Sequence, residues 1–124
     1  MAKYVDGFVV PVPRNKLDDY RKMARKGSKL WLEHGALEFR ECVADDVKTG
    51  KLTSFPKAVD RKRNETVVFS WIVFRSRAHR DKVNAKVMAD PRLAAMGSMD
   101  DMPFDGKRMI YGGFEVIVDA VSSG

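Results

Sequence analysis

The stretch TVVFSWIVF, residues 66–74, decides the fold, because its β-branched and aromatic residues predict a strand that is apolar on both faces. Successive side chains of a strand point to opposite faces. One face would carry Val67, Phe69, Trp71 and Val73, and the other would carry Val68, Ile72 and Phe74, interrupted by Ser70. A strand of this kind must be covered on both faces. The remaining sequence can cover one of them, so we expect a partner subunit to cover the second.

The segments around this strand predict a ferredoxin-like α+β fold. A 3.6-residue apolar period predicts a helix that begins after an N-cap at Asn15 and ends at Gly35, where a positive φ is expected. Further strands are expected at residues 4–12, 36–44 and 108–120, a second long helix at 76–89, and short helices at 54–59 and from Pro91. The order β-α-β-β-α-β gives a four-stranded antiparallel sheet with two helices on one face.

The uncovered face of this sheet predicts a homodimer. The strand at 66–74 alone would expose three or four large apolar side chains there. Burying each contributes roughly 1.5–3 kcal/mol, or about 5–10 kcal/mol in sum. This is comparable with the whole stability of a typical domain, about 5–15 kcal/mol. Two sheets packed face to face about a twofold axis would remove this surface from water, so we expect a homodimer formed through sheet faces.

Length and composition indicate a single domain over residues 1–124, with 44% hydrophobic and 32% charged residues. The net charge of +6 permits attraction to anions, but the charges are scattered, so we do not expect nucleic acid as a partner. No apolar run approaches the roughly 20 residues of a membrane span, and the first residues lack the apolar core of a signal peptide. We therefore expect no membrane association and a cytoplasmic location, which the single cysteine, Cys42, also fits.

Five segments carry a family resemblance: YVDGFVVPVP at 4–13, GALE at 35–38, DDV at 45–47, VFSWIV at 68–73 and PFDGKRMIYGGF at 103–114. They resemble the corresponding segments of the YbaA-like proteins, a bacterial family of unknown function placed in the dimeric α/β-barrel superfamily. The resemblance covers nearly the whole chain, and the last segment is its most specific part. It implies the ferredoxin-like dimer, but no activity, because none is established for the family.

Two carboxylates fall on apolar strand faces and are candidates for acid or base chemistry. Asp6 shares its strand face with Phe8, and Glu41 shares its face with Phe39. A buried carboxylate must find a partner or raise its pKa, and either suits proton transfer. The alternative for Asp6 is a structural acid held by an arginine such as Arg108, or a bulge that turns it outward. The alternative for Glu41 is a partly wet position on an edge strand.

His34 is the third catalytic candidate, near the end of the first predicted helix. A histidine in the last turn also stabilises a helix terminus electrostatically, and this remains the competing interpretation. No set of histidine, cysteine and acidic residues has a recognised ligand spacing, so we expect no metal site. We also expect no cofactor, because neither a phosphate-binding loop nor a dinucleotide glycine pattern is present.

Together these residues predict a small-molecule site between the sheet and the helices. Its expected parts are ligand-binding Phe8, Trp71 and Tyr111, the methionine-rich segment 96–105, and polar groups from Asp6, Glu41 or His34. Such a site would take an apolar or aromatic molecule, and proton abstraction, isomerisation or oxygenation of an activated aromatic would need no cofactor. One alternative is a non-enzymatic structural or stress-related dimer. The other is an RNA-binding protein, since the RNA-recognition motif shares this element order, although a buried sheet face would remove its RNA platform.

Overall fold

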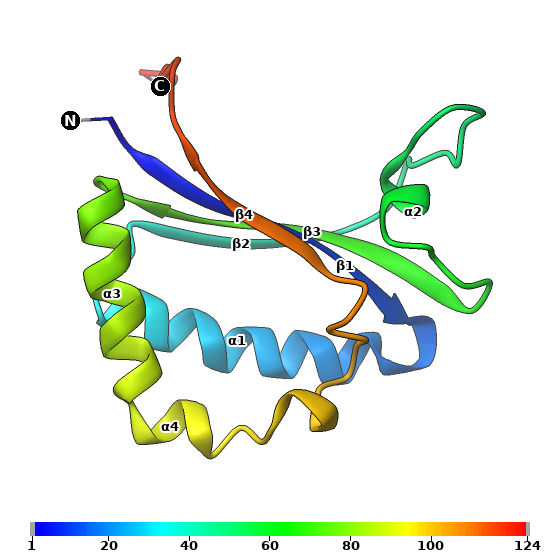
Figure 1. Cartoon of the computed structure of the whole chain (residues 1–124), viewed down its shortest axis with the longest axis horizontal. Helices are drawn as coiled ribbons and strands as arrows, with labels where there is room; N and C mark the ends of the chain where they lie inside the picture. The colour runs from blue at the N-terminus through cyan, green and yellow to red at the C-terminus, as the bar shows by residue number, and fades with distance from the viewer. Residues whose placement is uncertain (1, 124) are drawn as a thin grey trace.

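A sheet of four antiparallel strands, in the order β2-β3-β1-β4, forms the centre of the computed structural model, which describes residues 2–123 (Figure 1). The elements in chain order are β1 (Tyr4–Pro13), η1 (Arg14–Lys16), α1 (Leu17–Glu33), β2 (Glu38–Val43), α2 (Phe55–Ala58), β3 (Glu65–Phe74), α3 (Arg77–Ala89), α4 (Pro91–Ala94), η2 (Met99–Asp101) and β4 (Ile110–Glu115). This confirms the predicted ferredoxin-like α+β fold. None of the helices in residues 2–123 is both long and apolar enough to cross a bilayer.

Local signals explain most element boundaries. Gly35 follows α1 with a φ of 117°, as predicted. The side chains of Ser54 and Asp90 cap α2 and α4 by accepting backbone N–H bonds. The N-cap prediction for Asn15 is wrong, because residues 14–16 form the short 3₁₀ turn η1 and α1 begins after it. The fourth strand is also shorter than the predicted 108–120.

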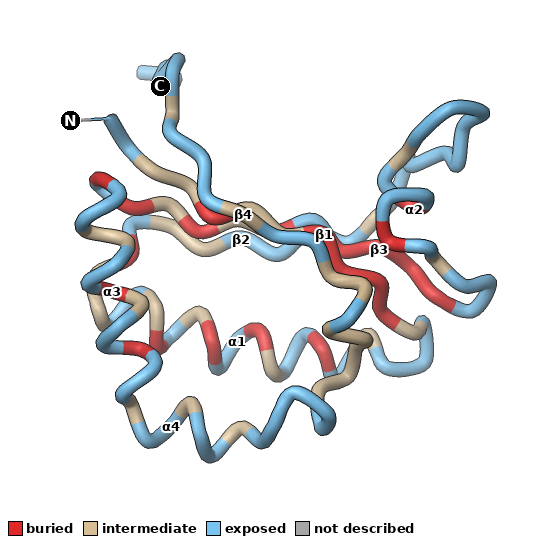
Figure 2. Tube along the Cα trace, viewed as in Figure 1, coloured by how far each residue is buried: buried red, intermediate tan, exposed pale blue. Residues whose placement is uncertain are grey.

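The helices α1 and α3 lie against one face of the sheet and form the core with it (Figure 1). The side chains that this face directs toward the helices come from alternate positions of β1 and β3, and the best buried apolar ones are Val10, Val12, Val68, Ile72 and Phe74. Val83 and Val87 of α3 meet them at the end of the sheet where β3 finishes. Figure 2 shows the buried residues concentrated along β1, β3 and the inner side of α1.

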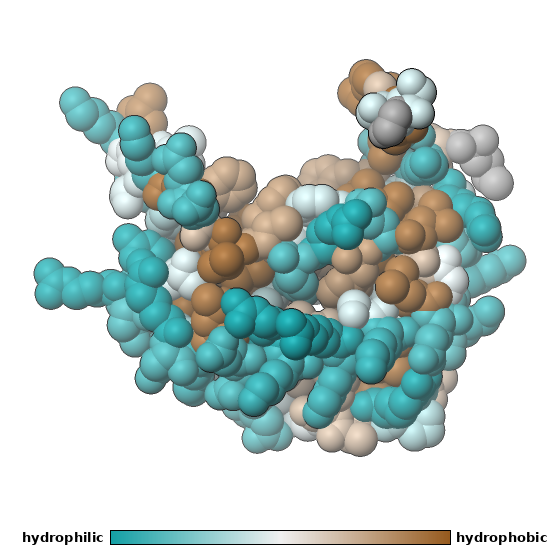
Figure 3. Space-filling model, turned by 180° about the vertical axis from the view of Figure 1, so that it is seen from behind, coloured by the Kyte–Doolittle hydropathy of each residue, from teal (hydrophilic) through white to brown (hydrophobic). Residues whose placement is uncertain are grey.

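The opposite face of the sheet is partly covered, by α2 and its flanking segments. Val59 packs there against Val9 and Val67 in a separate buried cluster. This corrects the expectation that nothing in the chain would cover the second face. The rest of that face carries exposed Phe69, Ile110 and Phe114, and we call it the open face. Seen from behind, the molecule is hollowed between the raised α2 end and the raised end that holds the termini (Figure 3).

Candidate functional site

A cavity of about 460 Å³ lies between the helix-covered face of the sheet and a wall made by α1, α3 and the segment 96–109. Its lining is mainly apolar. The aromatic residues in it are Phe8, Tyr20, Trp31, Phe39, Trp71, Phe104 and Tyr111. All six methionines between residues 2 and 123 also line it: Met23, Met88, Met96, Met99, Met102 and Met109. Thioethers adapt their shape easily, so this wall can fit apolar molecules of different outline.

Strand register explains how the aromatic residues meet. Phe8 lies directly opposite Tyr111 across β1 and β4, and their rings stack with centroids 6.2 Å apart. Tyr20 of α1 meets Phe104 edge-on at 5.8 Å, which joins the helix to the methionine-rich segment. The predicted ligand-binding residues Phe8 and Tyr111 therefore do come together on the cavity wall.

Glu41 lies on this wall as predicted, and two hydroxyl groups hold its carboxylate. The Tyr20 hydroxyl donates to Glu41 Oε1 at 2.7 Å. Ser70, directly opposite on β3, also hydrogen-bonds the carboxylate. Burial among apolar groups raises the pKa of Glu41, although both hydroxyl donors act in the opposite direction. Burial and the nearby carboxylate raise the pKa of the Tyr20 phenol as well.

Glu41 is not sealed from water. Edge strand β2 leaves the residue exposed on its outer side, where a second cleft of about 330 Å³ is lined by Arg21 and Arg25 of α1. Glu41 is therefore a partly wet residue of an edge strand, and it also lines the cavity.

Asp6 forms the other polar part of the cavity wall and is 7% exposed. Arg80 Nη1 of α3 donates to Asp6 Oδ1 at 2.7 Å, and Asn84 Nδ2 lies 3.5 Å from Oδ2. Trp31 Nε1 donates in turn to Asn84 Oδ1 at 3.0 Å, so the cluster joins β1, α3 and α1. Burial raises the pKa of Asp6 against the opposing effect of Arg80. Asp6 is thus an acid held by an arginine, but the expected partner Arg108 is wrong.

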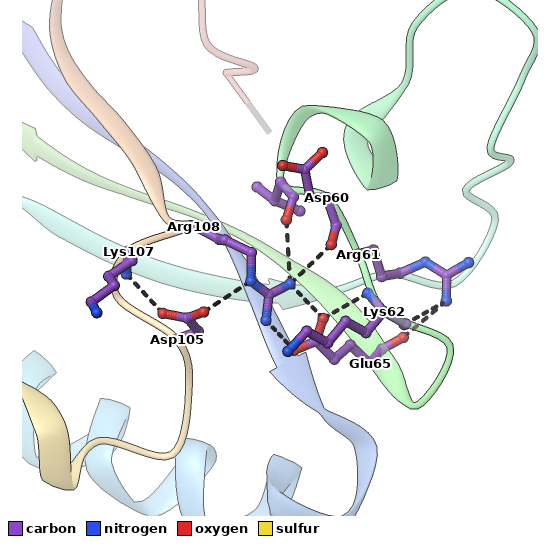
Figure 4. A network of polar contacts seen from close by, with 8 residues as sticks. Asp60, Arg61, Lys62, Glu65, Asp105, Lys107 and Arg108 are labelled. Atoms are coloured by element: carbon purple, nitrogen blue, oxygen red, sulfur yellow. Dashed lines mark hydrogen bonds and ion pairs between the residues drawn. The ribbon is translucent and has the colours of Figure 1, made fainter.

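Arg108 instead anchors the end of the methionine-rich segment (Figure 4). Its Nη1 and Nη2 donate to Glu65 Oε1 and Oε2 at 2.7 and 2.6 Å, and its Nε donates to Asp105 at 2.9 Å. Nη1 also donates to the backbone carbonyl of Asp60 at 3.0 Å. These hydrogen bonds of the Arg108 guanidinium connect the start of β4 to the start of β3, and so they hold one side of the cavity wall in place.

The structure does not bring His34 or the Trp71 indole to the cavity. His34 Nε2 lies 2.9 Å from Asp90 Oδ2, in a contact between the end of α1 and the cap of α4. Trp71 contributes to the wall, but alternation along β3 directs its indole to the open face, where Nε1 donates to Glu38 at 2.7 Å. This corrects the expectation that both side chains would face one pocket with Asp6 and Glu41.

The cavity residues that the sequence did not indicate include Tyr20, Trp31, Arg80 and Asn84. A signal for the last two was present, because residues four apart on a helix share one face. Arg80 and Asn84 therefore had to point the same way, but nothing in the sequence indicated that this way was toward Asp6. No group of three or more histidine, cysteine or acidic side chains suited to a metal occurs within residues 2–123.

Comparison with known proteins places this chain in a family. The family model described as "Protein of unknown function (DUF1428)" matches residues 3–106. The uncharacterized protein YbaA of Escherichia coli K12 is 57% identical over 117 residues, which cover 94% of this chain and 98% of YbaA. The chain belongs to the DUF1428 family. The YbaA of Shigella flexneri matches with the same identity and coverage.

One solved structure shares the fold of this DUF1428 protein. It is described as a dimeric ferredoxin-like protein from an uncultured marine organism, and the match has a TM-score of 0.55. The alignment covers 97% of this chain and 100% of that chain, with 11% sequence identity. The likeness confirms the ferredoxin-like fold. The family match confirms the YbaA-like resemblance found in the sequence.

Proposed function

We propose that this DUF1428 protein is a homodimer that binds a small apolar or aromatic molecule in the cavity of each subunit. The observation that carries the binding proposal is the composition of the cavity wall. All six methionines of residues 2–123 gather there with the aromatic rings of Phe8, Tyr20, Trp31, Phe39, Phe104 and Tyr111, whereas the polar groups form two compact clusters around Glu41 and Asp6. Ligand sites are typically apolar cavities of about 300–1,000 Å³ with a few fixed polar groups. This cavity has that size and that arrangement.

The open face supports the homodimer. The Phe114 ring packs over Gly7 and Gly112, which have no side chains to keep it off the backbone. Phe114 nevertheless remains 63% exposed. Phe69 and Ile110 continue this apolar surface across β3 and β4. A contiguous apolar surface of this kind marks an interaction site. A second copy suits it, because two hollowed sheet faces can pack about a twofold axis, and the solved ferredoxin-like neighbour is described as dimeric.

Residues Tyr111 and Phe114 test the two parts of the proposal separately, because they lie on opposite faces of the same strand. For the cavity, we expect saturable binding of the neutral fluorescent dye N-phenyl-1-naphthylamine by the wild-type protein. Tyr111→Glu places a charge beside Phe8 and should weaken this binding at least about tenfold. Phe114→Glu should leave the affinity unchanged. Absence of saturable binding, or equal binding by Tyr111→Glu, would contradict the cavity proposal.

For the homodimer, sedimentation equilibrium at micromolar concentration should give twice the 14.0 kDa mass of one chain. Phe114→Glu should raise the dissociation constant at least about 100-fold, because it would bury an unpaired charge in the interface. Tyr111→Glu is the matched control and should remain dimeric. A wild-type monomer at these concentrations would refute the homodimer, and a dimer without dye binding would favour the structural, non-enzymatic alternative.

A further inference from the structure

We infer that the cavity selects aromatic ligands that carry a hydroxyl group, and that Glu41 accepts the hydrogen bond from that hydroxyl. This inference rests on the proposed function, since it requires a ligand in the cavity. It adds the chemical class of the ligand, a neutral phenol, and assigns the ligand-selecting residue.

The partners of Glu41 distinguish it from three acids that arginines hold. Asp6 is paired with Arg80, Glu65 with Arg108, and Asp90 with Arg92. Glu41 forms no ion pair within the described residues, although Arg21 and Arg25 line the cleft beside it. Among the described residues, the polar groups that contact it are the hydroxyls of Tyr20 and Ser70. The local structure therefore selects neutral hydroxyl donors for this carboxylate.

The carboxylate also keeps capacity for a further donor. An ionised carboxylate has about four lone-pair positions, and the two hydroxyl groups occupy two of them. Glu41 borders both the main cavity and the second cleft, at the edge of β2. A ligand that carries a hydroxyl can take the place of a water molecule here without leaving the carboxylate short of a donor.

Tyr20 shows how an aromatic hydroxyl is accommodated at this position. Its phenol reaches Glu41 at 2.7 Å while its ring packs edge-on against Phe104. A ligand phenol would repeat this arrangement from the cavity side, with its ring among the methionine and aromatic side chains. The raised pKa of Glu41 supports this role, because a more basic carboxylate is a stronger acceptor for a phenolic hydrogen.

Charge on the cavity wall disfavours the other polar aromatic ligands. An aromatic carboxylate would meet the carboxylates of Glu41 and Asp6. The one cation of the main cavity that could oppose this, Arg80, is already bound by Asp6 and Asp81. Arg40 also borders the cavity, but it lies on the open-face side of β2, opposite Trp71. A neutral hydroxyl donor avoids this repulsion and meets an acceptor.

The test compares 2-naphthol with naphthalene by titration calorimetry at neutral pH. A purely apolar cavity would prefer naphthalene, because the hydroxyl group costs desolvation. We expect the wild-type protein to bind 2-naphthol about tenfold more tightly than naphthalene. Glu41→Gln should reduce this ratio to about two or less while leaving naphthalene affinity unchanged. Glu38→Gln is the matched control, since Glu38 lies on the same strand but faces the open side, and it should keep the wild-type ratio.

The outcomes separate this inference from the proposed function. If neither compound binds the wild-type protein, the proposed function fails and the inference fails with it. If both bind with similar affinity, or if the preference for 2-naphthol survives in Glu41→Gln, ligand binding stands and the role of Glu41 is refuted. A thermal melt of each variant identifies unfolding, and naphthalene binding by Glu41→Gln shows that its cavity is intact.

Discussion

Replacing Arg108 with methionine is expected to destabilise the protein by about 3–5 kcal/mol, because it leaves the Glu65 carboxylate buried without its partner. Glu65 is 3% exposed, and both of its carboxylate oxygens accept from the Arg108 guanidinium. The same substitution releases Asp105 and the carbonyl of Asp60 (Figure 4). Urea denaturation of the two proteins at neutral pH measures the difference directly.

Two control variants show whether the buried charge causes this effect. Arg21→Met removes an arginine from an exposed pair with Asp18 and should cost less than about 1 kcal/mol. Adding Glu65→Met to Arg108→Met removes the unpaired carboxylate and should recover a large part of the loss. A loss below about 1 kcal/mol for Arg108→Met would show that the fork of hydrogen bonds does not stabilise the fold.

The pH dependence of this loss follows from the lowered pKa of Glu65. Hydrogen bonds from Arg108 hold the pKa of Glu65 below its ordinary value of 4.5 in the folded protein. A lowered folded-state pKa contributes stability that is present above the unfolded-state value and is lost as the pH falls through the folded-state value. The difference between wild type and Arg108→Met should therefore be largest near neutral pH and should shrink below about pH 4.5.

Phe74→Ala is expected to cost about 3–5 kcal/mol through the cavity that it leaves in the core. Phe74 is 0% exposed and packs with Val83 and Val87 of α3, where the end of β3 meets that helix. Phe74→Leu keeps most of the volume and should cost less than about 1.5 kcal/mol. Equilibrium denaturation in urea, with an unchanged slope, checks both values.

A half-exposed phenylalanine supplies the comparison for this prediction. Phe55 of α2 is 50% exposed, so Phe55→Ala removes much less buried surface and should cost clearly less than Phe74→Ala. If Phe55→Ala and Phe74→Ala lowered the free energy of unfolding equally, the end of β3 would not be the tightly packed part of the core. Because Phe74 and the Glu65–Arg108 pair lie at opposite ends of β3, their losses should be additive.

The sequence was enough to predict which side chains share one face of a strand. The sequence pattern correctly grouped Val67, Phe69, Trp71 and Val73 on one face, and it correctly placed Glu41 with Phe39. These predictions hold because a strand has a period of two residues whatever packs against it. Phe8 and Tyr111 were also expected on the cavity wall, and the structure pairs them across β1 and β4.

The pattern did not decide which face the helices cover, and this explains the position of Trp71. Both faces of residues 66–74 are apolar, so alternation alone treats them alike. The handedness of the β-α-β crossover places the helices on one side, and the register then directs the Trp71 indole to the other. The position of His34 has a similar cause, because its contact with Asp90 depends on how α4 lies beside the end of α1.

The sequence by itself determined the fold class and the strand faces, because apolar periodicity and turn residues act locally along the chain, and its resemblance to the YbaA-like proteins indicated the family. Only the tertiary structure decided that Arg80 holds Asp6, that Arg108 holds Glu65, and that Tyr20 meets Glu41. Each of these pairs joins residues more than twenty positions apart, and several arginines and acids could satisfy one another equally well in sequence. The docking of the helices on the sheet selects one partner for each, because a hydrogen bond forms only where the packed backbone brings donor and acceptor within about 3 Å.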